Sequence, residues 1–268
     1  MYTDTLDGFA AAARRKASWA RTDPPAFFVA SAMAGVYVGL GIILILSLGA
    51  LVDPIWQRLV MGASFGIALT LVVFAGSELY TGLTMSMTIG VLRAGVASRD
   101  LARVWTLAWF GNLAGALLLA WLFTSAGGGI PHGEGAALLQ RIAAAKMNAE
   151  AGELVARGIL CNWLVCLALW IGARVQGDTA KMIAIAWCLF AFIASGYEHS
   201  VANMTLFALA LAGEPGPGVS VAGAAYNLGW VTLGNTIAGV LMMASAYAFV
   251  GRERRALPVP GRGAVVPD

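Results

Sequence analysis

Charged residues are scarce in this chain, since only 12% of its 268 residues are Asp, Glu, Lys or Arg. A soluble globular domain contains about 25% of them. Hydrophobic residues make up 59% of the sequence, and the mean hydropathy is +0.78. This balance excludes a soluble domain and indicates an integral membrane protein. The net charge is +3, and no nucleic-acid partner is expected.

Histidine and cysteine are also rare, with two and three residues. The cysteines, Cys161, Cys166 and Cys188, all lie inside apolar runs, where each is expected to be a small buried hydrophobic residue. The sequence has no C-x-x-C pair and no His/Cys cluster, so no metal or other cofactor is expected. It has no recognisable Ser/His/Asp arrangement either, which argues against an enzyme.

Long apolar runs dominate what is present. A helix that crosses the hydrocarbon core of a membrane needs about 20 residues. We therefore predict an all-α integral membrane protein in which residues 1–268 form one transmembrane domain surrounded by lipid. Its six transmembrane helices are predicted at 27–49, 60–92, 102–124, 154–173, 182–212 and 222–250.

The basic residues are distributed unevenly between the joins. Most of them fall on one side when the N-terminus, segments 93–103 and 174–181 and the C-terminal tail are placed together. The positive-inside rule then puts both termini in the cytoplasm. Residues 1–22 are predicted to form an amphipathic helix that anchors the chain at the membrane surface, and residues 251–268 a cytoplasmic tail.

Two of the runs, 60–92 and 182–212, are too long for one crossing and carry polar residues midway. The first contains "GSELYTG" with Glu78, and the second contains "SGYEHSVANM" with Glu198. The next spans contain "WFGNLAG" and "WVTLGNTIAG", and both pairs of motifs are separated by about 120 positions. This offset indicates a duplicated three-span unit. Because three is odd, the second copy inserts upside-down, and such an inverted 3+3 repeat places a pathway at its interrupted helices.

The residues after each interruption are of the types that begin helices: Thr81 and Thr84 in one half, Ser200 and Asn203 in the other. Two half-helix N-termini are therefore expected to face the middle of the protein. Unpaired N–H groups and the helix dipole make such a site favourable for an anion.

The charged and titratable residues of the interruptions are expected to differ in role. Glu78 and Glu198 are expected to turn away from the pathway and accept the unpaired N–H groups of the breaks, because an intramembrane carboxylate needs partners. His199 has Leu79 as its counterpart in the other repeat, so the fold alone does not require it. It is the one side chain at this depth that titrates near neutral pH, which makes it the candidate to meet substrate.

Two further polar residues leave alternatives open. Asn162, in "CNWLVC", is either a helix–helix hydrogen-bonding residue or a donor lining the pore. Lys146, in "RIAAAKMNAE", is either a solvated charge or part of a funnel that collects anions.

Together, "SGYEHSVANM", "GSELYTG", "CNWLVC" and "AAAK" resemble the formate/nitrite transporter family along essentially the whole chain. The residues of the motifs "CNWLVC" and "GYEHS" are most similar to those of the nitrite-channel branch of the family. The resemblance implies an aquaporin-like channel protomer with six spans. It also implies a homopentamer with one pore per protomer, in the bacterial inner membrane.

The same resemblance assigns roles to individual residues. It implies a central pore histidine at His199, a facing threonine at Thr81, a pore asparagine at Asn162 and an anion-attracting lysine at Lys146. Tyr80 stands where formate channels tend to have Phe. Apolar constrictions are implied at Phe65, Leu69, Leu79, Tyr80, Val165 and Phe192.

The predicted function is a channel or transporter for small monovalent anions, nitrite foremost, in which protonation of His199 assists passage. Formate or a broader set of weak-acid anions, and proton-coupled transport, remain alternatives. A channel for neutral solutes is disfavoured because neither break carries an Asn-Pro-Ala motif; around Asn203 the sequence is "VANM".

Overall fold

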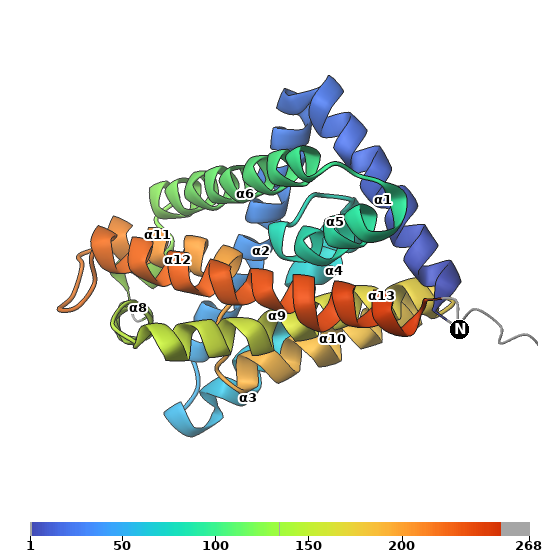
Figure 1. The fold of residues 1–268 in the computed structure, drawn as a ribbon. Helices are drawn as coiled ribbons and strands as arrows, with labels where there is room; N and C mark the ends of the chain where they lie inside the picture. The colour runs from blue at the N-terminus through green and yellow to red at the C-terminus, as the bar shows by residue number, and fades with distance from the viewer. Residues whose placement is uncertain (1, 134, 253–268) are drawn as a thin grey trace, which may run out of the picture.

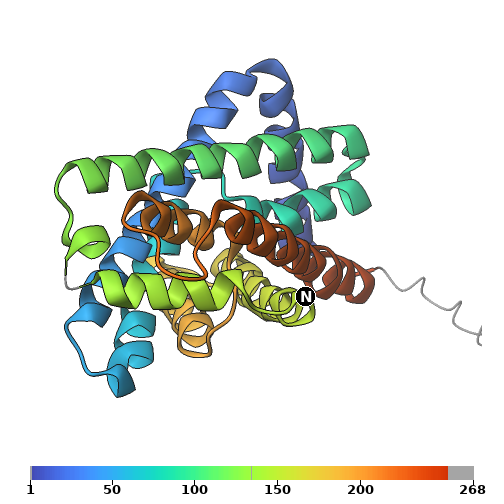
Figure 2. The same ribbon diagram turned by 90° about the vertical axis from the view of Figure 1, so that its left-hand side faces the viewer.

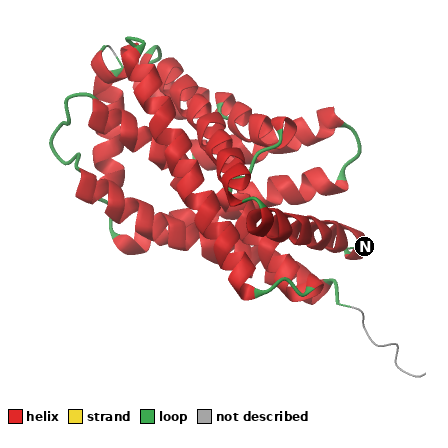
Figure 3. Cartoon of the chain, turned by 90° about the horizontal axis from the view of Figure 1, so that it is seen from above, coloured by secondary structure: helices red, strands yellow, loops and turns green. Residues whose placement is uncertain are grey.

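The computed structural model describes residues 2–133 and 135–252, and every regular element in this part is helical (Figure 3). The predicted all-α class is therefore confirmed. The first elements are α1 (Thr3–Thr22), α2 (Pro24–Ala50), α3 (Pro54–Ser64), α4 (Gly66–Ala75), α5 (Tyr80–Ala94), α6 (Ser98–Ser125) and α7 (Gly129–His132). The remaining elements are α8 (Ala136–Met147), α9 (Ala151–Arg174), α10 (Asp178–Ala194), α11 (Ser200–Ala212), α12 (Val221–Ile237), the π-helical segment η1 (Ala238–Ser245) and α13 (Ala246–Val250).

Five helical stretches of the described chain are long and apolar enough to cross a membrane: Pro24–Ala50, Pro54–Ala75, Ser98–Ser125, Ala151–Arg174 and Val221–Val250. The predicted span 182–212 is not among them, because it is divided into α10 and α11. The count of six spans remains a prediction.

The apolar runs 60–92 and 182–212 are both interrupted, between α4 and α5 and between α10 and α11 (Figure 1). A glycine with left-handed backbone lies in each break, Gly76 with φ +77° and Gly196 with φ +74°. A residue with a Cβ rarely adopts this conformation, whereas glycine adopts it readily and so ends helices. The chain therefore leaves the helix at the glycine and starts a new helix a few residues later.

The half-helices that follow the breaks lie inside the bundle. Most residues of α5 and of α11 are buried. Figure 2 shows α11 and α12 between α6 and α9, and α11 contacts α2, α6, α8 and α12. The irregular backbone of both breaks is thus enclosed by protein, which is how such backbone is tolerated at membrane depth.

Small residues bring the longest helices into direct backbone contact. Helix α2 packs on α6, and α9 packs on α12 (Figure 1). A Cβ on Gly35 would collide with the backbone carbonyl of Asn112, and a Cβ on Gly234 would collide with that of Val155. Such close approach is typical of helix pairs in membranes, where packing and polar contacts replace the hydrophobic effect.

Large apolar side chains cover much of the outer surface. Trp187 is 67% exposed, Trp121 63% and Phe110 55%. Exposed apolar area on this scale indicates a surface that contacts lipid or neighbouring protein.

Helix α1 docks on the protein through its apolar face, and its position at the membrane surface remains a prediction. Leu6, Ala10, Ala13, Ala17 and Ala20 recur every three or four residues and are buried, and the helix packs against α5 and α6. The apolar face predicted to serve as a membrane anchor is therefore occupied by protein, because its alanines are small enough for helix–helix contact. Residues 253–268 of the predicted cytoplasmic tail lie outside the described part of the chain.

Candidate functional site

Asn112, on α6, holds the first break together. Its Oδ1 accepts the N–H of Tyr80 at 2.9 Å, and its Nδ2 donates to the carbonyls of Ser31 at 2.7 Å and Glu78 at 2.9 Å. The side chain is fully buried. One amide thus satisfies the donor that begins α5 and links it to α2.

Asn235, on α12, does the same for the second break. Its Oδ1 accepts both the N–H of Ser200 at 3.0 Å and the Ser200 hydroxyl at 2.8 Å. Its Nδ2 donates to the carbonyls of Gly158 at 2.8 Å and Glu198 at 3.0 Å. The two breaks therefore use the same chemical device, supplied by the asparagine-containing motifs that recur in the sequence.

The glutamates do not accept the N–H groups of the breaks, and that expectation was wrong. The Glu78 carboxylate forms an ion pair with Lys16, on α1. The Glu198 carboxylate pairs with Lys146 Nζ at 2.8 Å and accepts from Asn203 Nδ2 at 2.6 Å. Both carboxylates are nearly buried, so each requires a full positive charge nearby. A neutral amide suits the break itself better, because it satisfies an N–H and a C=O together.

His199 caps helix α11, a role expected instead for Ser200 and Asn203. The imidazole Nδ1 accepts the N–H of Ala202 at 3.1 Å, and Nε2 lies 3.2 Å from the Thr81 hydroxyl oxygen. A nitrogen that accepts an N–H bond carries no proton, so the neutral ring carries its proton on Nε2. That proton points to Thr81, at the start of the opposite half-helix.

Thr84 and Asn203 also act differently from expectation. Thr84 Oγ1 donates to the Thr81 carbonyl at 2.6 Å rather than accepting an N–H group. Asn203 Nδ2 donates to Glu198 and, at 2.9 Å, to Asn227 Oδ1. Thr84 thus bonds within its own helix and Asn203 links α11 to α12, and neither side chain begins a helix.

Asn162 is fully buried on α9 and bonds across helices. Its Nδ2 donates to the Thr81 carbonyl at 3.2 Å, Thr84 Oγ1 at 3.0 Å and the Asn235 carbonyl at 2.6 Å. Of its two predicted alternatives, these contacts match the helix–helix hydrogen bond. Its Oδ1 has no hydrogen-bond partner among the described residues.

Three hollows lie in succession through the protein. The first, which we call the α8 cavity, has a volume of about 410 Å³ and is lined by residues that include Arg58, Lys146, Phe192, Glu198 and His199. The second, the α1 cavity, is also about 410 Å³ and is lined by residues that include Phe9, Lys16, Leu69, Glu78 and Leu79.

Between these cavities lies a middle void of about 10 Å³. Phe192 and His199 line both the void and the α8 cavity, and Leu69 and Leu79 line both the void and the α1 cavity. Along α9, Arg157, Val165 and Leu169 line the α8 cavity, the void and the α1 cavity in turn. The three hollows therefore form one interrupted path.

Five of the six residues named as constrictions lie at the middle void. They are Phe65, Leu69, Leu79, Val165 and Phe192, and the void is also lined by Val38, Ala68, Leu189 and His199. The Phe65 and Phe192 rings meet edge to face with centroids 5.5 Å apart. The His199 ring lies parallel to Phe192, with centroids 6.0 Å apart.

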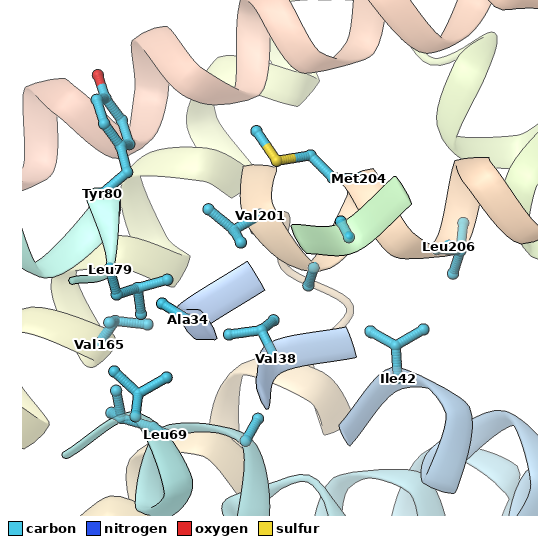
Figure 4. Packing of buried hydrophobic residues seen from close by; sticks show 14 of the residues in the cluster. Ala34, Val38, Ile42, Leu69, Leu79, Tyr80, Val165, Val201, Met204 and Leu206 are labelled. Atoms are coloured by element: carbon cyan, nitrogen blue, oxygen red, sulfur yellow. The ribbon is translucent and has the colours of Figure 1, made fainter. Parts of the chain in front are cut away.

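Tyr80 does not line any of these three hollows. In Figure 4 its ring points away from Leu69, Leu79 and Val165, and its hydroxyl bonds the Thr236 hydroxyl at 2.8 Å. The phenol hydroxyl thus has a polar partner on α12, whereas an apolar constriction would leave it without a hydrogen bond. Its assignment as a constriction residue is corrected accordingly.

Lys16 is the residue of the path that the sequence reasoning missed. Each cavity contains one lysine–glutamate pair, Lys16 with Glu78 and Lys146 with Glu198. A signal existed, because Lys16 falls on the same helical face as the buried Ala13 and Ala20.

The fold and these hollows define a class: an α-helical membrane protein with a transport path that narrows to an apolar void beside one imidazole. Comparison with known proteins gives the same class. Residues 3–249 match the family described as formate/nitrite transporter, and the chain belongs to this family.

Relatives cover nearly the whole chain. The nitrite transporter NirC of Salmonella typhimurium (strain LT2) is 51% identical over 247 residues, which are 92% of this chain and 91% of that protein. A solved structure described as an FNT family ion channel has a TM-score of 0.90 and 50% identity, and covers 93% of this chain and 100% of its own. Another, described as a pentameric formate channel with formate bound, has a TM-score of 0.74 and 25% identity, over 84% and 96% of the two chains.

Proposed function

We propose that this protein carries small monovalent anions across a membrane, nitrite foremost, and that proton transfer at His199 assists their passage. One observation carries the proposal. Among the described residues that line the middle void, His199 is the one titratable side chain, and all the others are apolar. Nitrite is preferred to formate because the relative called a nitrite transporter is 51% identical, whereas the relatives named for formate are 35%, 31% and 25% identical.

The narrowness of the void explains why a proton is needed. An unpaired charge in apolar surroundings costs several kcal/mol, and a void of about 10 Å³ has no room for the water that would solvate an anion. A protonated imidazole there would be costly as well. When an anion arrives together with a proton, the two charges compensate each other, and transfer of the proton to the anion leaves neutral His199 and a neutral acid.

The surrounding residues have supporting roles in this proposal. Thr81 Oγ1 accepts a hydrogen bond from Nε2–H of neutral His199, and Asn162 holds the backbone of Thr81 in place. Lys146 supplies positive charge to the α8 cavity, although its pairing with Glu198 means that it also compensates a buried carboxylate. Phe65, Leu69, Leu79, Val165 and Phe192 exclude hydrated ions from the void.

The larger architecture is part of the proposal. Residues 1–268 form one channel domain of six spans in an inverted 3+3 repeat with an aquaporin-like protomer, which the matching roles of Asn112 and Asn235 support. The solved pentameric channel supports a homopentamer. The distribution of basic residues supports cytoplasmic termini, including the 251–268 tail, in a bacterial inner membrane.

Proton-coupled transport is the second candidate, favoured by the position of His199 on the path itself. The same ring would then bind one proton for every anion in a fixed cycle. Stimulation of labelled nitrite efflux by unlabelled nitrite on the opposite side of the membrane is expected for such a cycle and not for a channel.

A substrate panel tests the proposed function. Proteoliposomes containing the protein are expected to take up nitrite faster than empty liposomes, with formate second and glycerol no faster than the lipid background. Nitrite entry is measured by fluorescence quenching, and glycerol entry is measured by light scattering. Glycerol uptake without nitrite uptake contradicts the proposal and indicates a neutral-solute channel.

A further inference from the structure

The α8 cavity and the α1 cavity differ in charge. Four basic residues and one acidic residue line the α8 cavity: Arg58, Arg141, Lys146, Arg157 and Glu198. The α1 cavity is lined by Lys16 and Glu78, whose charges cancel. The two cavities have equal volumes, but only the α8 cavity has an excess of positive charge.

The four cations of the α8 cavity are not equally engaged. Lys146 pairs with the buried Glu198, and Arg157 Nη2 lies 3.3 Å from Glu153 Oε2. These two charges are compensated by carboxylates and are less available to a ligand.

The other two guanidinium groups have no carboxylate partner among the described residues. Arg141 Nη2 donates to the neutral Gln57 Oε1 at 2.8 Å. Arg58 has neither a hydrogen bond nor an ion pair with any residue that the structure describes. Two uncompensated positive charges therefore face one hollow.

The backbone of the second break leaves Arg58 open to the cavity. Gly196, in that break, has no side chain, and a Cβ placed there would lie 4.0 Å from Arg58 Cζ and Nη2. The guanidinium thus lies near the break that leads to Glu198 and His199, in the direction that a side chain at Gly196 would take.

The size of the hollow allows a ligand larger than the transported anion. The α8 cavity has about 410 Å³ of space, whereas the middle void has about 10 Å³. A guanidinium group presents several N–H donors in a planar fork that matches the oxygens of phosphate or sulfate, so two such groups favour a multivalent oxyanion.

We propose that Arg58 and Arg141 form a binding site for tetrahedral dianions, sulfate and phosphate, in the α8 cavity. A dianion bound there is too large for the middle void and closes the path to nitrite. The site rests on the charge and shape of the cavity, and its blocking effect rests on the proposed function.

Binding is tested first without transport. Radiolabelled sulfate is equilibrated with the protein in a lipid-free neutral detergent, at constant ionic strength set with chloride. The protein is expected to retain sulfate, and Arg58→Gln/Arg141→Gln is expected to bind it at least tenfold more weakly. Arg14→Gln/Arg15→Gln removes the same charge from exposed positions on α1 and is expected to bind like the unmodified protein. Equal sulfate binding by both double variants overturns the proposal.

The phosphate group of a lipid has the same chemistry and is distinguished by competition. Inorganic phosphate is expected to displace the labelled sulfate. Displacement by short-chain phosphatidylglycerol but not by inorganic phosphate overturns the proposal of a site for free dianions.

Blocking is tested by nitrite uptake with sulfate on both faces of the proteoliposome membrane, so that orientation has no effect. The half-inhibitory sulfate concentration, measured against each variant's own nitrite uptake without sulfate, is expected to rise at least tenfold in Arg58→Gln/Arg141→Gln. Arg58→Gln alone removes no hydrogen bond or ion pair with a described residue and is expected to show a smaller rise in the same direction. No inhibition by sulfate overturns the blocking effect. Sulfate binding without any nitrite uptake by the unmodified protein overturns the proposed function and leaves the site.

Discussion

In the His199→Asn variant, nitrite uptake is expected to lose its dependence on pH and to fall on the order of 100-fold, because an unassisted charge at this depth costs about 3 kcal/mol. In the unmodified protein uptake is expected to rise as the pH falls, since a proton must accompany the anion. Asparagine is a good N-cap residue and keeps the start of α11, where His199 Nδ1 accepts the N–H of Ala202. The change therefore removes the titratable group and keeps the fold.

The measurement is nitrite uptake by proteoliposomes between pH 5.5 and 8, corrected for the permeation of nitrous acid through empty liposomes. His132→Asn, at an exposed position on α7, is the matched control and is expected to behave like the unmodified protein. A His199→Asn variant with an unchanged pH profile would show that His199 does not handle the proton.

The second large effect is expected in Asn235→Leu. The leucine removes four hydrogen bonds and leaves the Ser200 N–H and the carbonyls of Gly158 and Glu198 without their partner. Each unsatisfied buried group costs about 1–3 kcal/mol. We expect the unfolding midpoint in detergent to fall by about 10 °C, with loss of nitrite uptake because the start of α11 is no longer held beside the path.

Thermal unfolding followed by size-exclusion chromatography measures this effect. Asn148→Leu is the matched control, since Asn148 is exposed and water can replace its bonds to the carbonyls of Ala144 and Gly218. The control is expected to unfold within about 2 °C of the unmodified protein. If Asn235→Leu is as stable as Asn148→Leu, the second break is not held by Asn235.

The position of the breaks could be predicted from the sequence, whereas the contacts that stabilise them could not. Gly76 and Gly196, the polar residues after them and the length of both runs are local signals, and each break lies where these signals predict it. The partners of Glu78 and Glu198 come from α1 and α8, which are distant in sequence. No local pattern states which lysine will reach which carboxylate.

The direction in which individual side chains point could not be predicted from the sequence either. Leu79 and Tyr80 are neighbours in sequence, yet Leu79 lines the middle void and Tyr80 bonds Thr236 on α12. At the start of a helix, consecutive residues point in different directions, and the exact first residue decides which one faces the path. The apolar face of α1 had the same ambiguity, because amphipathicity does not distinguish a lipid surface from a protein partner.

In the proposed mechanism, nitrite passes the middle void with a proton supplied through His199. The most direct test records nitrite entry and internal pH together in the same proteoliposomes, with the background of empty liposomes subtracted. We expect internal acidification in step with nitrite entry, with about one proton for each anion. Nitrite entry that leaves the internal pH unchanged and follows the membrane potential would contradict it.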